Sequence, residues 1–100
     1  MELTQGVRFD TLELSPELLR ALLERNIVQS TPVQAGCIPP MLAWRDVIAK
    51  APTGTGKTFA YGIPIVEHID PEDDSVQAVI LAPTRELAIQ ITDELRVLYA

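Results

Sequence analysis

The sequence predicts an α/β fold in which parallel strands are flanked by helices. Three observations favour it: short apolar runs at residues 46–51 and 76–82, a helical repeat after each run, and a glycine-rich turn after the first. A strand, a helix and a second strand in this order form a right-handed crossover between parallel strands. Two strands cannot cover both faces of a sheet, so we expect the sheet to be incomplete within these 100 residues.

Two helices are expected before the first strand. Residues 15–26 place leucines at helical spacing, and Ser15 can serve as the N-cap. A second helix is expected over residues 31–38, because Pro39 and Pro40 lack the backbone N–H that a continuing helix needs. A short apolar segment follows, with one more helical turn as the alternative.

Two further helices are expected, one after each strand. The first covers residues 57–69, and Pro64 inside it should bend or locally break the helix. The acidic run at residues 70–74 is interpreted as a solvated loop. The last helix covers residues 85–99 and has an apolar side at helical spacing. The members of that side are Leu87, Ala88, Ile91, Leu95 and Leu98.

Composition and charge restrict the class of protein. Hydrophobic residues make up 47% of the chain and charged residues 22%, which is typical of a globular protein. The longest apolar runs are too short to span a bilayer. The single cysteine, Cys37, excludes an internal disulfide and favours a reducing, cytoplasmic location. A net charge of −6 argues against broad electrostatic binding of nucleic acid, so a phosphate chain would be held by a few placed groups and helix ends.

Residues 51–58, Ala-Pro-Thr-Gly-Thr-Gly-Lys-Thr, form the strongest functional pattern. Glycines allow backbone N–H groups to converge on an anion, and the following helix adds the positive end of its dipole. Lys57 can then reach the β- and γ-phosphates of a nucleotide, and the Thr58 hydroxyl can hold Mg²⁺. The alternative is a turn rich in Gly and Thr with a solvated lysine.

Residues 30–34, Ser-Thr-Pro-Val-Gln, have two explanations. Thr31 as N-cap, Pro32 at the first helical position and Gln34 three residues after the cap form a capping box, which needs no function. Alternatively, the Gln34 carboxamide reads a nucleotide base, because its acceptor and donor match the edge of adenine. The two explanations differ in where the Gln34 amide points.

Residues 83–88, Pro-Thr-Arg-Glu-Leu-Ala, follow the second predicted strand, where a parallel sheet presents its ligands. Thr84 can cap the helix, but Arg85 would place a cation at the positive end of the helix dipole. An anionic partner would make that position favourable, so Thr84 and Arg85 are candidate phosphate contacts. The alternative is an ordinary capped helix with Arg85 paired to a nearby acid.

Taken in order, Phe9, residues 30–34, residues 51–58 and residues 81–90 resemble the opening of a DEAD-box ATP-dependent RNA helicase. The resemblance extends from about Phe9 to Leu98. It implies that residues 1–100 are the N-terminal portion of the first of two RecA-like P-loop NTPase domains, with the remainder of the helicase core absent. Four positions depart from the family pattern: Asn26, Ile27, Ser30 and Trp44.

The resemblance implies a role for each matching residue. Gln34, in the family's Q motif, would bind adenine, and Thr31 would tie that motif to the phosphate-binding loop. Phe9 matches the aromatic residue seventeen positions before the Q motif and would stack on the adenine. Lys57 and Thr58 would be catalytic, with Thr58 also holding the metal. The residues that would hold the phosphates of ATP are Thr53, Gly54, Thr55, Gly56, Lys57 and Thr58. Those that would contact the RNA backbone, without sequence preference, are Pro83, Thr84 and Arg85.

The resemblance further implies the biochemical activity. An intact protein of this kind would couple ATP binding and hydrolysis to local unwinding of RNA duplexes, with ATP and Mg²⁺ as cofactors. The 100 residues alone would not be catalytic, because the acidic box that activates water is missing. The alternatives are a non-catalytic fragment that binds adenine nucleotide or self-associates, and a DNA helicase of the same superfamily.

Overall fold

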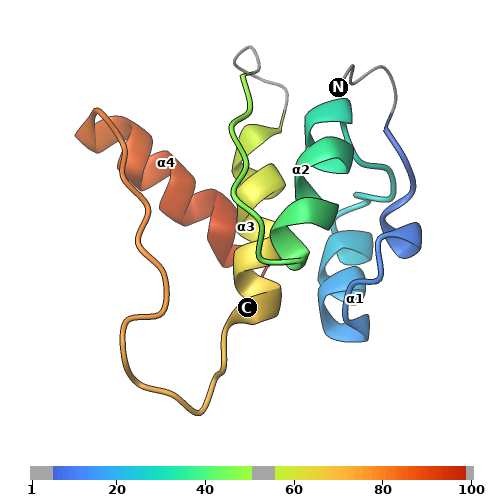
Figure 1. The fold of residues 1–100 in the computed structure, drawn as a ribbon, viewed down its shortest axis with the longest axis horizontal. Coiled ribbons are helices and arrows are strands. Elements are labelled where there is room, and N and C mark those ends of the chain that lie inside the picture. Colours follow the sequence, from blue (N-terminus) through green and yellow to red (C-terminus); the bar gives the residue numbers. More distant parts are fainter. Residues whose placement is uncertain (1–5, 51–55, 99–100) are drawn as a thin grey trace.

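The computed structural model describes residues 6–50 and 56–98. Within those ranges the chain forms one short 3₁₀ helix and four α-helices. In Figure 1, α3 lies between α2 and α4, while α1 and η1 pack on the other side of α2 and α3. The elements are η1 (Phe9–Thr11), α1 (Pro16–Glu24), α2 (Pro32–Leu42), α3 (Lys57–His68) and α4 (Arg85–Arg96).

Helix α1 begins as predicted, and hydrogen bonds join its N-cap to α3. The Ser15 hydroxyl accepts a hydrogen bond from the Leu18 N–H (3.3 Å), which is the capping contact expected of an N-cap serine. Ser15 also donates to Glu67 of α3, from its backbone N–H (3.0 Å) and from its hydroxyl (2.7 Å). One carboxylate therefore joins the start of α1 to the last turn of α3.

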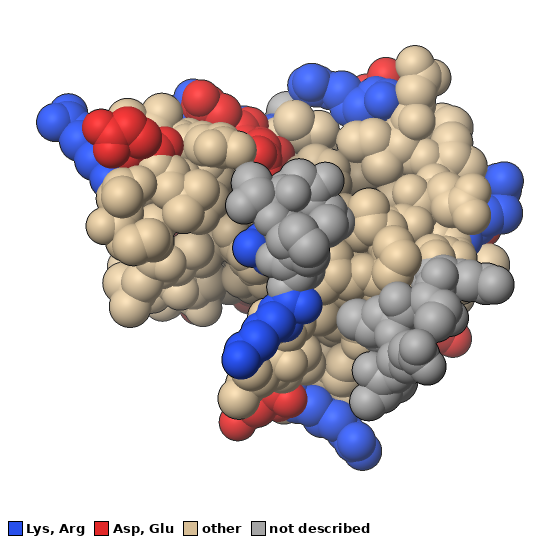
Figure 2. Space-filling view, turned by 90° about the horizontal axis from the view of Figure 1, so that it is seen from above, with Lys and Arg blue, Asp and Glu red and all other residues tan. Residues whose placement is uncertain are grey.

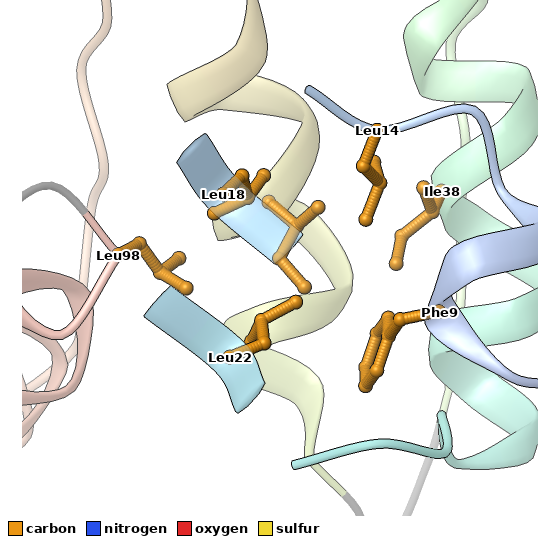
Figure 3. Close-up of a cluster of buried hydrophobic side chains, with 7 residues drawn as sticks. Phe9, Leu14, Leu18, Leu22, Ile38 and Leu98 are labelled. Atoms are coloured by element: carbon orange, nitrogen blue, oxygen red, sulfur yellow. The ribbon is translucent and has the colours of Figure 1, made fainter. Parts of the chain in front are cut away.

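A short antiparallel contact positions the N-terminal arm. Arg8 and Gln29 form an isolated bridge, the Phe9 N–H donates to the Val28 carbonyl (3.0 Å), and the Ser30 N–H donates to the Val7 carbonyl (2.7 Å). This pairing directs Phe9 inward, and Figure 3 shows its ring among the core side chains. The core cluster consists of Phe9, Leu14, Leu18, Leu22, Ile38, Ile63 and Leu98.

The predicted stop at Pro39 and Pro40 is wrong. Helix α2 continues through both prolines to Leu42, so the alternative of one more helical turn is confirmed. Proline disturbs the backbone hydrogen bonds on its N-terminal side, but its own carbonyl can still accept. The Ala43 N–H donates to the carbonyls of Pro39 (3.2 Å) and Pro40 (3.1 Å) and so closes the last turn. Pro64 likewise lies inside α3 without dividing it.

The two predicted strands are absent from the described part of the chain. Residues 46–50 and 76–82 have no helix and no ladder partner there. Figure 1 shows the first segment beside α2 and α3 and the second towards α4, so neither serves as the other's neighbour. A strand forms only when a second backbone supplies hydrogen bonds, and apolar sequence cannot supply them. The parallel sheet predicted from the sequence is therefore not observed.

The acidic loop and the last helix follow the predictions more closely. Residues 70–77 are exposed and outside the helices, as expected of a solvated loop. In α4, Ile91 is buried and Leu95 packs against the core, whereas Leu87 on the predicted apolar side is 36% exposed. Cys37 is buried, and this burial raises the pKa of its thiol. No helix in the described residues is long and apolar enough to cross a membrane.

Candidate nucleotide site

The N-termini of α2 and α3 meet through the side chain of Gln34. The Thr31 N–H donates to Gln34 Oε1 (2.9 Å), and the Gln34 N–H donates to Thr31 Oγ1 (3.4 Å), which completes the predicted capping box. Gln34 Nε2 in turn donates to the Gly56 carbonyl (3.0 Å). Only 4% of Gln34 is exposed, and its amide oxygen and nitrogen are both engaged. Gln34 thus closes a helix end and contacts the glycine-rich loop at the same time.

Gly56 is required at this contact for two separate reasons. Its φ of 82° lies in the left-handed region, which side chains with a Cβ rarely adopt. A Cβ at this position would also collide with Gln34 Nε2 and lie 3.3 Å from Thr31 Cγ2. The backbone at Gly56 therefore lies so close to the N-terminus of α2 that only a residue without a Cβ fits there. The structure brings three predicted site residues together here: Thr31, Gln34 and Gly56.

Lys57 and Thr58 occupy the first turn of α3, directly after Gly56. Lys57 is exposed and makes no ion pair among the described residues, and Thr58 is half-buried. Figure 2 views this end of the molecule from above and shows Lys and Arg side chains both near the middle of the face and at its edges. The first turn of α3 thus combines a free cation, a hydroxyl and the positive end of a helix dipole, a combination that favours phosphate.

Thr53, Gly54 and Thr55 lie outside the described residues. Within the described part of the chain, no group of three or more His, Cys, Asp or Glu side chains is placed to hold a metal ion. An open, mainly apolar cavity of about 300 Å³ adjoins Lys57. Its apolar walls come from α2, α3 and residues 47–49, and its lining includes Val33, Cys37, Met41, Val47, Ala60 and Tyr61.

Phe9, which was predicted to stack on adenine, lies in the core. Its ring is 2% exposed and packed within the core cluster (Figure 3). The antiparallel contact between Arg8 and Gln29 holds the neighbouring backbone in place. In this conformation Phe9 stabilises the core, and its stacking on adenine stays a prediction.

The third predicted motif lies at the start of α4. Thr84 Oγ1 accepts from the Leu87 N–H (3.1 Å), so Thr84 is the N-cap. The ion pairs of the described residues are Arg8–Asp10 and Asp93–Arg96, and neither occupies the exposed Arg85. Pro83 is exposed as well. Figure 1 shows the start of α4 well apart from the starts of α2 and α3, so this motif forms a separate surface.

Sequence reasoning missed two contacts of this region. The bond from Gln34 to the Gly56 carbonyl spans twenty-two residues, and the tie from Ser15 to Glu67 spans fifty-two. The glycine pattern of residues 51–58 was the signal available for the first. No local pattern distinguishes Glu67 from any other glutamate in a helix.

Comparison with known proteins identifies the family. The family model for the DEAD/DEAH box helicase matches residues 31–100. The DEAD-box ATP-dependent RNA helicase CshA of Bacillus licheniformis is 51% identical over 89 residues, which cover 89% of this chain and 18% of that protein. The chain thus spans about a fifth of the length of that relative.

Solved structures agree with the sequence comparison. A DEAD box protein from the hyperthermophile Methanococcus jannaschii matches with a TM-score of 0.86 and 38% identity, covering 91% of this chain and 25% of that one. Dbp5 of S. cerevisiae, solved bound to RNA and ADP BeF3, matches with a TM-score of 0.86 and 36% identity, covering 91% and 24% respectively. The chain described here therefore belongs to the DEAD/DEAH box helicase family.

Proposed function

We propose that this chain is the ATP-binding N-terminal portion of a RecA-like domain in an ATP-dependent RNA helicase. The observation that carries the proposal is the buried Gln34 amide, which joins the N-terminus of α2 to Gly56 directly before Lys57. Relatives named ATP-dependent RNA helicases support the activity, and so does a relative solved with RNA and ADP BeF3. Because the chain spans 18% of such a relative, activity is proposed for the intact protein.

The described residues fit a nucleotide. The closeness of Gly56 to Gln34 leaves no room for a Cβ, and the exposed Lys57 carries a cation to the same helix end. Lys57 would bind the phosphates together with residues 53–56, and Thr58 would hold Mg²⁺. ATP and Mg²⁺ would supply the transferable phosphoryl group and the charge that stabilises it. Lys57 and Thr58 would orient that group.

Gln34 would read adenine with the remaining hydrogen-bonding capacity of its amide. Among the described residues, Oε1 accepts once, from the Thr31 N–H, and Nε2 donates once, to the Gly56 carbonyl. A second lone pair of Oε1 and a second hydrogen of Nε2 could therefore engage the edge of adenine. Because Nε2 also binds the Gly56 carbonyl, adenine binding would be coupled to the loop that holds the phosphates.

Pro83, Thr84 and Arg85 would contact the RNA backbone without reading its sequence. The exposed Arg85 and the N–H groups at the start of α4 present positive charge there. Residues 46–50 and 76–82 would become strands of a parallel sheet once neighbouring strands are present, with the intact protein acting in the cytoplasm. This portion alone would bind nucleotide without hydrolysing it, because its sequence lacks the acidic box that activates water in the family.

Replacing Lys57 tests the phosphate site. Lys57→Ala in the intact protein should lower ATP affinity at least tenfold, because the cation facing the phosphates is lost. The matched control is Lys50→Ala, which removes another exposed lysine that lies outside the first turn of α3. ATP affinity by calorimetry that is equal in wild type and Lys57→Ala would refute the proposal.

Replacing Gln34 separates base reading from helix capping. If Gln34 reads adenine, Gln34→Ala should weaken ATP binding by about 1–3 kcal/mol and leave GTP binding unchanged. If Gln34 acts only by capping α2 and holding Gly56, both nucleotides should weaken equally. Parallel titrations with ATP and GTP decide between the two outcomes.

Replacing Arg85 tests the RNA surface. Arg85→Ala should weaken RNA binding uniformly across sequences. It should also reduce the slope of the logarithm of affinity against the logarithm of salt concentration by about one. Arg96→Ala is the control, because Arg96 lies on the same helix but is paired with Asp93 (3.5 Å). Equal RNA affinities and salt slopes for wild type and Arg85→Ala would remove Arg85 from the site.

A further inference from the structure

A second surface lies at the opposite end of α3 from Gly56. Trp44 follows α2 and is 77% exposed, although its φ of 63° lies in the left-handed region that bulky side chains avoid. Its ring stacks on His68, with centroids 3.7 Å apart and an interplanar angle of 7°. His68 Nε2 in turn donates to the Leu42 carbonyl (3.1 Å). An exposed indole is thus held in one orientation despite an unfavourable backbone.

The stacked rings form one wall of an open hollow of about 400 Å³. Ile65 and Ile69 of the α3 end, together with Val76, contribute apolar lining. The polar lining comes from residues 73–77 and includes Asp73 and Gln77. An aromatic wall beside a carboxylate is chemically suited to a planar cation.

The loop that borders the hollow is well organised. Gln77 accepts from the Asp70 N–H (2.8 Å) and donates to the carbonyls of Asp70 (2.8 Å) and Asp73 (3.0 Å). Ser75 donates to Asp73 Oδ1 from its N–H (2.9 Å) and from its hydroxyl (2.7 Å), and these bonds lower the pKa of Asp73. Asp73 therefore remains a carboxylate across the neutral pH range.

The negative charge of this loop is not balanced by a basic residue within the loop itself. Residues 70–74 include four acids and no base. The ion pairs of the described residues are Arg8–Asp10 and Asp93–Arg96, neither of which involves this loop. Uncompensated carboxylates beside an exposed indole repel nucleic acid and attract cations.

We propose that Trp44 and the acidic loop at residues 70–74 form a docking site for an arginine-containing peptide segment of a partner protein. A guanidinium stacks on the exposed indole face while carboxylates of the loop accept its hydrogen bonds. Arginine suits the site better than lysine, because a planar guanidinium can stack on the indole ring and donate hydrogen bonds to carboxylates at the same time. The site does not depend on the proposed nucleotide function, since about 18 Å of helix separates it from Gly56.

The test uses a short fluorescent peptide of arginines separated by glycines and the intact protein. Fluorescence anisotropy should show saturable binding, and Trp44→Ala should weaken it about tenfold. Trp44→Gly should weaken it equally while relieving the backbone strain, so a loss shared by both variants does not come from misfolding. A lysine–glycine peptide should bind more weakly.

The charge contribution is tested by removing two loop carboxylates that make no side-chain hydrogen bond in the described structure. Glu72→Gln combined with Asp74→Asn should weaken the arginine peptide severalfold and flatten its salt dependence. The control, Glu17→Gln with Glu24→Gln, removes the same charge from exposed positions of α1 and should leave binding unchanged.

Three results would overturn the proposal. The first is equal peptide affinity for wild type and both Trp44 variants. The second is equal weakening by the loop pair and the α1 control pair, because that outcome indicates non-specific attraction. The third is a Trp44-dependent dimer in sedimentation analysis with no peptide binding, because the surface would then receive a second copy of the chain.

Discussion

Gly56 and Gln34 constrain one another at the residue scale. The left-handed backbone of Gly56 places its carbonyl within 3.0 Å of Gln34 Nε2, and the absence of a Cβ keeps the two groups from colliding. The capping box fixes the other side of the Gln34 amide. A change at either residue therefore affects both the helix end and the glycine-rich loop.

Gly56→Ala should lower the free energy of unfolding by about 1–3 kcal/mol. Part of that loss comes from placing a Cβ in the left-handed region, and the rest comes from displacing Gln34. Urea denaturation measures it. Gly36→Ala is the control, since Gly36 lies inside α2, where alanine has the better helix propensity by up to about 1 kcal/mol. Equal stabilities of the two variants would show that the contact with Gln34 is unimportant.

The sequence predicted single-residue features when their cause was local. The capping box of Thr31 and Gln34, the cap at Ser15 and the cap at Thr84 all depend on residues three positions apart, and all three are confirmed. Phe9 shows the limit of that reasoning. An isolated aromatic side chain can face a ligand or the core, and its burial here accompanies the pairing of Arg8 with Gln29, which spans twenty-one residues.

At the scale of elements, helix existence was predictable and helix ends were less so. The proline rule failed for α2 because Pro39 and Pro40 disturb hydrogen bonds only on their N-terminal side, while their own carbonyls accept from the Ala43 N–H and complete the last turn. The strand predictions failed for a different reason. An apolar run such as residues 76–82 favours a strand that is buried between two neighbouring strands. No such neighbouring strand is among the described residues, so the run has no backbone partner for hydrogen bonds there.

The tie between Ser15 and Glu67 predicts how α1 and α3 stay together. Glu67→Ala should lower the free energy of unfolding by about 1.5–3 kcal/mol, because hydrogen bonds to a charged acceptor are lost at a partly buried position. Glu67→Gln should cost less, since one side-chain oxygen still accepts from Ser15.

Chemical denaturation measures the free energy of unfolding of Glu67→Ala and Glu67→Gln, with Glu17→Gln as the control. Glu17 is an exposed acid in the first turn of α1, so its replacement should change stability by a few tenths of a kcal/mol only. A Glu67→Ala variant as stable as Glu17→Gln would mean that packing alone holds α1 on α3.

At the scale of the whole molecule, the exposed apolar side chains gather on the two segments that were predicted as strands. Ile48 is 95% exposed, Val76 83% and Leu81 90%. Ala78 and Ile80 of the second segment also border an apolar hollow of about 530 Å³ against α3 and Leu95. Extended backbone with free N–H and C=O groups and apolar side chains is a template for pairing with another chain.

We therefore predict that the 100-residue chain associates with itself as its concentration rises. Sedimentation velocity across a concentration series should show a growing dimer or larger species. Ile48→Lys combined with Leu81→Lys should shift the distribution towards monomer, because charges on an unpaired edge oppose pairing. Leu23→Lys is the control. Leu23 is 62% exposed, but it lies in helix α1, whose backbone groups are hydrogen-bonded within the helix. A monomer that melts cooperatively in dilute solution and persists at high concentration would contradict the prediction. It would show that the helical core is stable while residues 46–50 and 76–82 remain exposed to solvent.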